Sequence, residues 1–104
     1  MEYVVVLAEV AKRDLDNIYE YIAIDCLEPI YAGNLVNKIK NAARSLSTLP
    51  YRHPLCQIAT NREARKFVVG GYNLFYVVDD QKKTVTIIRI ASSRRDFVNT
   101  NIRN

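Results

Sequence analysis

The chain has 104 residues, of which 49% are hydrophobic and 25% are charged, and its formal net charge at pH 7 is +4. This length predicts one domain over residues 1–104, and the balanced composition excludes disordered, collagen-like and fibrous classes. The excess of lysine and arginine favours nucleic acid, an acidic protein or an anionic surface as a partner, although many small domains carry such a charge without an anionic ligand.

The N-terminal residues and the cysteines indicate the compartment. No basic segment followed by an apolar run begins the chain, and each apolar run is far shorter than the roughly 20 residues that cross a bilayer. We therefore expect neither a signal peptide nor a membrane span, and a cytoplasmic location. Cys26 and Cys56 are expected to be reduced thiols, because a secreted domain of this size usually carries more cysteines.

Metal and cofactor motifs are missing from the sequence. Cys26, Cys56 and the single histidine, His53, fall short of a zinc-ligand set, and no glycine-rich phosphate loop occurs. We expect no metal and no cofactor. His53 has no carboxylate near it in the sequence to orient its ring, so it is a weak candidate for a general base.

The first half of the sequence predicts a strand and two helices. Residues 3–7 are rich in β-branched side chains, which favours a strand that is buried on both faces or paired early in a sheet. Apolar residues recur at spacings of three and four through residues 11–22 and again through residues 35–49, the period of amphipathic helices. Pro29 fits the first turn of the second helix and Pro50 ends it, so the two helices form a hairpin.

The second half predicts a loop followed by three strands. Residues 51–63 have no clear period and are interpreted as a loop. Strands over residues 64–69, 72–78 and 84–90 are separated by Gly70 and Gly71 and then by a polar turn, so they form an antiparallel meander. A short helix is expected over residues 94–102. The order predicts an α+β fold, in which the helical hairpin packs on one face of a sheet made by the N-terminal strand and the meander.

Cationic residues near the strand ends are the strongest candidates for function. Arg94 and Arg95 are able to grip phosphates or acidic side chains with forked hydrogen bonds, unless the adjacent Asp96 simply pairs with one of them on the surface. Tyrosines are weaker candidates. Tyr19, Tyr21 and Tyr76 lie in apolar-periodic segments and are expected in or beside the core, which leaves Tyr51 and Tyr72 open.

Arg65, Lys66 and Arg89 lie inside predicted strands. Arg65 and Lys66 are adjacent and therefore point to opposite faces of a regular strand, so at most one of them points the same way as Arg89. Arg89 has two interpretations, a cation that faces the target or a buried or half-buried arginine that is paired with an acid such as Glu63 or Asp79.

The order of elements, with the strings RKFVVGGYNLFYVV at residues 65–78 and VTIIRIASSRRDF at residues 85–97, resembles the RelE/ParE superfamily of bacterial type II toxins. The resemblance covers nearly the whole chain. It implies a growth-inhibiting toxin that is neutralised by a cognate antitoxin, in a complex that is oligomeric, with an acidic or amphipathic antitoxin segment on the helices and sheet edge. Lys38, Lys40 and Arg44 form either a solvated face or part of such a contact.

The resemblance leaves the target open. RelE-like members cleave messenger RNA in the ribosome, whereas ParE-like members poison DNA gyrase. RelE-like enzymes typically carry an arginine where this chain has Asn73, and many members carry a histidine where it has Ser92, which favours the ParE-like branch. Gyrase inhibition is the first hypothesis, metal-independent cleavage of ribosome-bound mRNA is the second, and a degenerate antitoxin-binding module is the third.

The candidate residues for target or phosphate binding are cationic or aromatic. RNA cleavage needs groups that take up and donate protons and cations that stabilise the phosphate, and Arg65 and Arg95 are weak candidates for such a catalytic role. Tyr72 and Phe97 are able to stack on a base. The complete set for target or phosphate binding is Arg65, Lys66, Tyr72, Arg89, Arg94 and Arg95.

Overall fold

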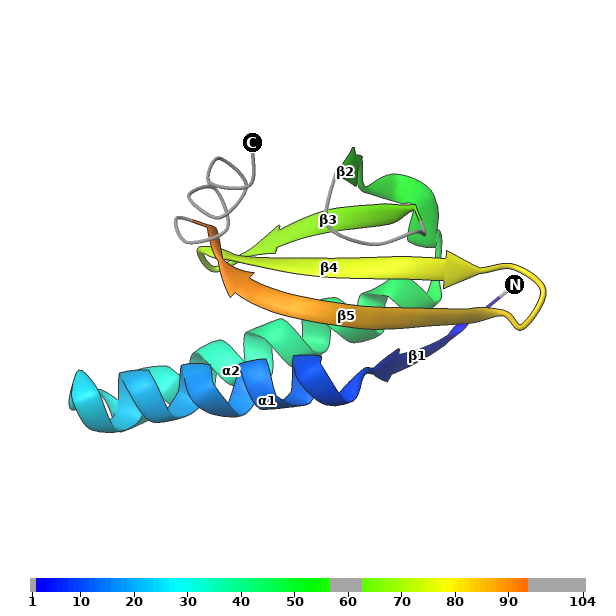
Figure 1. Cartoon of the computed structure of the whole chain (residues 1–104). Coiled ribbons are helices and arrows are strands. Elements are labelled where there is room, and N and C mark those ends of the chain that lie inside the picture. The colour runs from blue at the N-terminus through cyan, green and yellow to red at the C-terminus, as the bar shows by residue number, and fades with distance from the viewer. Residues whose placement is uncertain (1, 57–62, 94–104) are drawn as a thin grey trace.

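A five-stranded sheet carries a helical hairpin in the structure, a computed structural model that describes residues 2–56 and 63–93 (Figure 1). In chain order the elements are β1 (Val4–Leu7), α1 (Glu9–Glu20), the π-helical turn η1 (Tyr21–Asp25), α2 (Pro29–Arg44), the 3₁₀ turns η2 (Ser45–Ser47) and η3 (Pro50–Arg52), β2 (Leu55–Cys56), β3 (Ala64–Val69), β4 (Tyr72–Asp79) and β5 (Thr84–Ser92).

The strand order is β1-β5-β4-β3-β2, with β1 parallel to β5 and every other pair antiparallel. The predicted meander is therefore confirmed. Gly70 and Gly71 connect β3 to β4 with φ of 57° and 84°, the positive values that a two-residue hairpin turn requires. A side chain at Gly70 would also collide with the core, because its Cβ would lie 2.8 Å from Cδ1 of Leu35.

The core lies between the hairpin and one face of the sheet. It joins the apolar stripes of α1 and α2 to the inward residues of β4 and β5, among them Leu15, Ile18, Leu35, Ile39, Leu74, Tyr76, Val85 and Ile87. Tyr76 is fully buried, as expected, and its hydroxyl donates a hydrogen bond to the carbonyl of Pro50 over 2.7 Å. This bond matters because a buried hydroxyl without a partner is costly.

A β-bulge in β5 decides which face Arg89 occupies. Phe75 pairs with Arg89 and the next residue, Tyr76, pairs with Ile87, so Ile88 is an extra residue in β5. Ile87 and Ile90 consequently both join the core, although they are three residues apart. Strict alternation from Ile87 would have turned Arg89 into the core instead.

The helices differ in part from their prediction. The α-helical part of the second helix ends at Arg44 rather than at Pro50, and Leu49, which was expected on its apolar face, has φ of 49° and is 73% exposed. The prediction was wrong here because the residue before a proline disfavours the helical conformation. In the part of the chain that the structure describes, no helix has both the length and the apolarity needed to cross a membrane.

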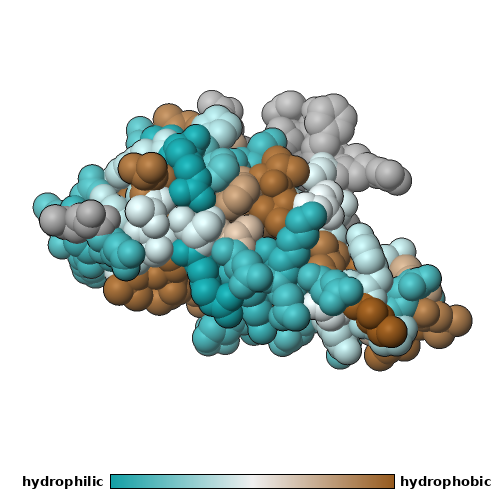
Figure 2. Space-filling view, turned by 180° about the vertical axis from the view of Figure 1, so that it is seen from behind, coloured by the Kyte–Doolittle hydropathy of each residue, from teal (hydrophilic) through white to brown (hydrophobic). Residues whose placement is uncertain are grey.

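The tip of the hairpin exposes aromatic and aliphatic side chains. Tyr19 and Tyr21, expected in or beside the core, are 42% and 57% exposed, so this prediction was wrong. The hairpin extends past the sheet (Figure 1), and hydrophobic residues gather at its end (Figure 2). Ile18 and Ile22, which continue the apolar stripe through the same segment, are buried, so the two tyrosines are exposed because they lie beside this stripe and not on it.

The strands at the two edges differ in part from their predictions. Leu55 and Cys56 lie inside the segment predicted as a loop, yet they form β2 and pair with β3, which adds a fifth strand. Two residues are too few to show a period in the sequence. Strand β1 is an edge strand that pairs with β5, and its Val4 and Val6 are 62% and 43% exposed. Of the two predicted alternatives, the strand paired in the sheet is therefore confirmed and the strand buried on both faces is excluded. The helix predicted over residues 94–102 lies outside the described residues.

Candidate functional site

Arg65 faces the hairpin side of the sheet and holds the segment before β2. It lies opposite Tyr76 in the β3–β4 register. Its Nη1 donates to the carbonyls of His53 and Tyr51 over 2.7 and 3.2 Å, and its guanidinium lies 5.0 Å from the centroid of the Tyr51 ring. These contacts are those of a residue that fixes the conformation of residues 51–53.

Lys66 points to the opposite face and lies in a row with Arg89. Lys66 pairs with Phe75 across β3 and β4, and Phe75 pairs with Arg89 across β4 and β5. Directly paired residues share a face of the sheet. The prediction that at most one of Arg65 and Lys66 points the same way as Arg89 is confirmed, and the residue that does so is Lys66. This face carries two cations over a buried phenylalanine.

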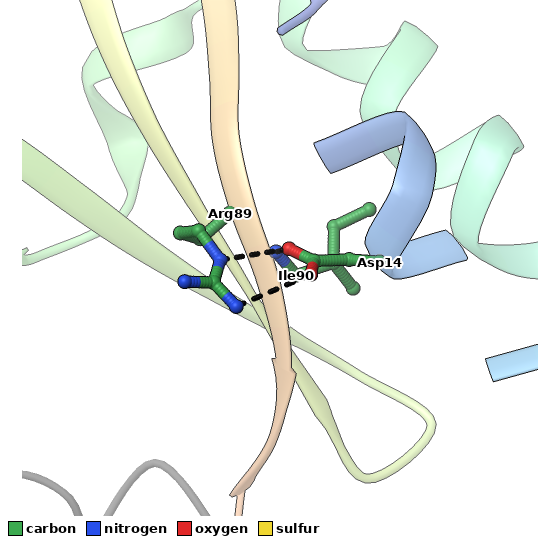
Figure 3. A network of polar contacts seen from close by, with 3 residues as sticks. All are labelled: Asp14, Arg89 and Ile90. Atoms are coloured by element: carbon green, nitrogen blue, oxygen red, sulfur yellow. Dashed lines mark hydrogen bonds and ion pairs between the residues drawn. The ribbon is translucent and has the colours of Figure 1, made fainter. Parts of the chain in front are cut away.

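Arg89 pairs with Asp14 of α1 and not with Glu63 or Asp79, so the predicted partners were wrong (Figure 3). Its Nε and Nη2 donate to the two carboxylate oxygens of Asp14 over 2.9 and 3.2 Å. The carboxylate also accepts the backbone N–H of Ile90 over 2.9 Å.

The reason for this pairing lies in the length of β1. Strand β1 ends at Leu7, opposite Ile87, whereas β5 continues to Ser92. Helix α1 takes the place of the missing strand, and Asp14 accepts the N–H that a longer β1 would have accepted. The Asp14 side chain is 12% exposed and that of Arg89 is 56% exposed, so the guanidinium remains partly available to a partner.

The two positions that depart from the RelE-like pattern lie close together at the end of the meander. Asn73 is 2% exposed, and its register partners are Val68 and Ala91. Ser93 donates to Oδ1 of Asn73 over 3.3 Å. The half-buried Tyr72 is paired with Ser92. Thus a neutral, buried amide lies at the strand position where an arginine is expected in a RelE-like enzyme.

The two arginines at the end of the meander lie beyond the described residues. Arg94 and Arg95 follow directly on Ser93, the last residue of the described range 63–93. Their assignment as target-binding residues therefore stays a prediction from the sequence.

A cluster that the sequence does not predict lies at the other end of β4. The Tyr3 hydroxyl donates to Asp80 over 2.7 Å, and Nζ of Lys83 lies 5.0 Å from the centroid of the Tyr3 ring. A hydrogen bond to Asp80 raises the pKa of Tyr51 to about 12, and hydrogen bonds from the two tyrosines lower the pKa of Asp80. The cluster joins the residue before β1, η3 and the β4–β5 turn, segments that no local pattern connects.

His53 is held as a neutral, stacked ring. Its centroid lies 3.9 Å from that of Phe67 with an interplanar angle of 18°, and its Nε2 is buried without a hydrogen-bond partner. Burial and the neighbouring Arg52 lower the pKa of His53. Arg52 donates to the carbonyls of Ser45 and Thr48 and so caps the end of the second helix. The stacking contact and the lowered pKa thus indicate a structural role for His53 rather than that of a general base.

A shallow groove runs between the two helices. The groove has a volume of about 370 Å³ and is lined by Leu15, Asp16, Tyr19, Glu20, Val36 and Lys40. Within residues 2–56 and 63–93, no three histidine, cysteine or acidic side chains lie close enough to hold a metal ion.

The fold and a family match assign the chain to a class of small α+β toxins. The family model described as "ParE toxin of type II toxin-antitoxin system, parDE" matches residues 5–97. The chain belongs to this family, which confirms the resemblance to the RelE/ParE superfamily. Among curated protein sequences, none matched the chain.

Solved structures share the fold. The chromosomal ParDE TA system from P. aeruginosa contains a chain with a TM-score of 0.69 and 19% identity, and the match covers 88% of this chain and 96% of that one. The toxin–antitoxin complex RelBE2 from Mycobacterium tuberculosis gives a TM-score of 0.56 and 26% identity over 88% and 92% of the chains. A mutant of the E. coli toxin RelE in the free state gives 0.62 and 17% over 96% and 93%.

Proposed function

We propose that this type II toxin inhibits bacterial growth by binding DNA gyrase through protein contacts and without nuclease chemistry. One observation carries the proposal. Asn73 is buried and neutral between Val68 and Ala91, where RelE-like enzymes carry a cation. Cleavage of RNA needs cations on the phosphate and groups that move protons, and an amide between two apolar neighbours supplies neither. The match to a ParE family model supports the same branch.

The proposed contact surface is the face of the sheet turned away from the hairpin. Lys66 and Arg89 lie in one row on this face, and Arg94 and Arg95 follow the end of β5 in the sequence. Arginine fits this role because its planar fork binds carboxylates in pairs of hydrogen bonds. Asp14 holds the Arg89 guanidinium in place before binding, so less side-chain conformational entropy is lost when the target binds. Arg65 then acts as a positioning residue for residues 51–53.

We further propose that a cognate antitoxin covers the groove between α1 and α2. The P. aeruginosa and M. tuberculosis structures are described as a toxin–antitoxin system and complex. In this chain the groove has the apolar side chains of Leu15 and Val36 beside Lys40, which suits an amphipathic segment with acidic residues at its edge. The complex is expected to be oligomeric and cytoplasmic.

Two assays with the purified chain test the target. In the first, plasmid supercoiling by gyrase is followed with added toxin, and inhibition is expected. In the second, mRNA on translating ribosomes is followed, and no cleavage is expected. The variant Arg95→Ala should lose gyrase inhibition by at least about tenfold while keeping its far-UV circular dichroism, and Lys12→Ala, on α1, is the matched control.

The results that contradict the proposal are equally distinct. Cut messages with unaffected supercoiling would establish the ribosome-dependent nuclease. Neither activity, with antitoxin binding retained, would establish a degenerate binding module.

A further inference from the structure

The hairpin tip is an acidic, apolar surface. Four large apolar side chains lie there, with exposed fractions of 64% for Ile24, 80% for Leu27, 80% for Ile30 and 55% for Tyr31. Residues 20–31 contain three acidic residues, Glu20, Asp25 and Glu28, and no lysine or arginine. The ion pairs within residues 2–56 and 63–93 are Lys12–Glu9 and Arg89–Asp14, so none of these three acids forms an ion pair with another described residue. An exposed apolar patch of this kind marks an interaction surface.

The opposite end of α2 is apolar and basic, which complements the apolar and acidic tip. Leu49, Tyr51 and Leu55 are 73%, 46% and 53% exposed. Residues 44–55 contain Arg44 and Arg52 and no acidic residue. One end of the helix is therefore acidic and apolar, and the other is basic and apolar.

A leucine with a left-handed backbone lies at each of these ends. Leu27, two residues before α2, has φ of 59°, and Leu49, five residues after it, has φ of 49°. This conformation is unfavourable for a residue with a Cβ and is usually left to glycine. The backbone at Leu27 closes the end of the preceding helical segment, because the N–H of Glu28 donates to the carbonyl of Ile22 over 3.0 Å. Both leucine side chains are nevertheless exposed, by 80% for Leu27 and 73% for Leu49.

Three asparagines form the centre of the exposed stripe of α2, and the exposed Lys38 and Lys40 flank it. Ile30, Asn34, Asn37, Asn41 and Arg44 follow one another at spacings of four, three, four and three, and all five are exposed. They form one solvent-facing stripe of the helix. Its centre is a row of three amides, each of which carries both donors and acceptors, so the row is complementary to a second copy of itself.

We propose that this chain forms a two-fold dimer in which the α2 helices pack antiparallel, centred on Asn37. In this arrangement Asn37 lies opposite Asn37 of the second copy, Ile30 lies opposite its Arg44, and Asn34 lies one residue out of register with its Asn41, a shift of about 1.5 Å. The 16 residues of α2 span about 24 Å, so both pairs of complementary ends meet at the same time. A two-fold contact is closed, because each copy presents the same surface. A tip-to-tip contact would instead bring like charges together.

Disulfide crosslinking tests the axis directly. Asn37→Cys, in a chain with Cys26→Ser and Cys56→Ser, places one thiol per copy at the two-fold axis, and a covalent dimer is expected under mild oxidation. Asn17→Cys in the same background is the matched control, since it exposes a thiol on α1 away from the stripe, and it should stay monomeric. A chain that keeps Cys26 alone should also stay monomeric, because the two tips lie at opposite ends of the dimer.

Charge reversal and sedimentation provide the second arm. Glu28→Lys and Arg44→Glu should each weaken dimerisation at least about tenfold, and the double variant should restore it. The proposal is overturned if the wild-type chain sediments as a monomer at all concentrations, if Asn37→Cys crosslinks no faster than Asn17→Cys, or if Cys26 alone crosslinks. These readouts do not depend on the target of the toxin.

Discussion

The carboxylate of Asp14 accepts the guanidinium of Arg89 and the backbone N–H of Ile90, so one side chain joins the first helix to the last strand. The same contact completes the edge of β5 where β1 has ended, and it fixes an arginine on the face proposed to meet the target. The fold and the proposed target contact therefore share one ion pair, and substitutions separate the two roles.

Asp14→Ala is expected to lower the free energy of unfolding by about 1–3 kcal/mol, because it leaves the N–H of Ile90 and one side of the guanidinium without an acceptor. Arg89→Ala should cost less, about 0.5–1 kcal/mol, because an exposed guanidinium keeps water as a partner. Urea unfolding of both variants measures the difference. Equal or reversed losses would show that the bond to Ile90 contributes little.

Alanine at each of the three glycines should give three different results. Gly33→Ala is expected to stabilise the chain by about 0.5–1 kcal/mol, because no atom lies within 4 Å of the added Cβ and alanine favours a helix. Gly71→Ala should cost about 1 kcal/mol for its positive φ. Gly70→Ala should cost more, since its Cβ also collides with Leu35. Thermal unfolding ranks the three, and a harmless Gly70→Ala would contradict the described turn.

His53 should make stability depend on pH. Burial and Arg52 lower its pKa below 6.5, so the unfolded chain binds a proton at a higher pH than the folded protein. Stability should therefore be fully present above 6.5 and decrease as the pH falls below that value. Denaturant unfolding across this window measures the slope, and His53→Phe should reduce it. An unchanged slope in that variant would assign the dependence to acidic groups.

Tyr51 should ionise at an unusually high pH. Its pKa of about 12 comes first from the hydrogen bond to Asp80, whose negative charge also disfavours a phenolate. Asp80→Asn should move this ionisation toward the ordinary tyrosine value of 10.0. Ultraviolet titration measures phenolate formation, and the Tyr51→Phe variant identifies the step that belongs to Tyr51. A titration that Asp80→Asn leaves in place would rule out the contact as its cause.

The order of the elements could be predicted from the sequence, because each long element has its own period. The spacing through Leu35 and Ile39 indicates a helix, and Gly70 with Gly71 indicates a hairpin turn. Strict alternation from Val85 and Ile87 would place Arg89 on the core face, which indicates a break in the alternation but does not locate the extra residue at Ile88. Only packing against the helices decides that Ile90 joins the core.

The part of the candidate site that could be predicted is the part set by the alternation of side chains along a strand. The opposite directions of Arg65 and Lys66 are a property of any regular strand. The partner of Arg89 was not predictable, because it depends on where β1 ends relative to β5. The contact between Tyr3 and Asp80 joins residues 77 positions apart, and no spacing rule reaches that far.

The most direct test of the proposed function is controlled expression of the chain in bacteria without an antitoxin, with the rates of DNA, RNA and protein synthesis measured in parallel at early times. We predict that DNA synthesis falls first and that plasmid DNA becomes relaxed, while messages stay intact. An early fall in protein synthesis with cleaved messages, or growth at the normal rate, would contradict the account.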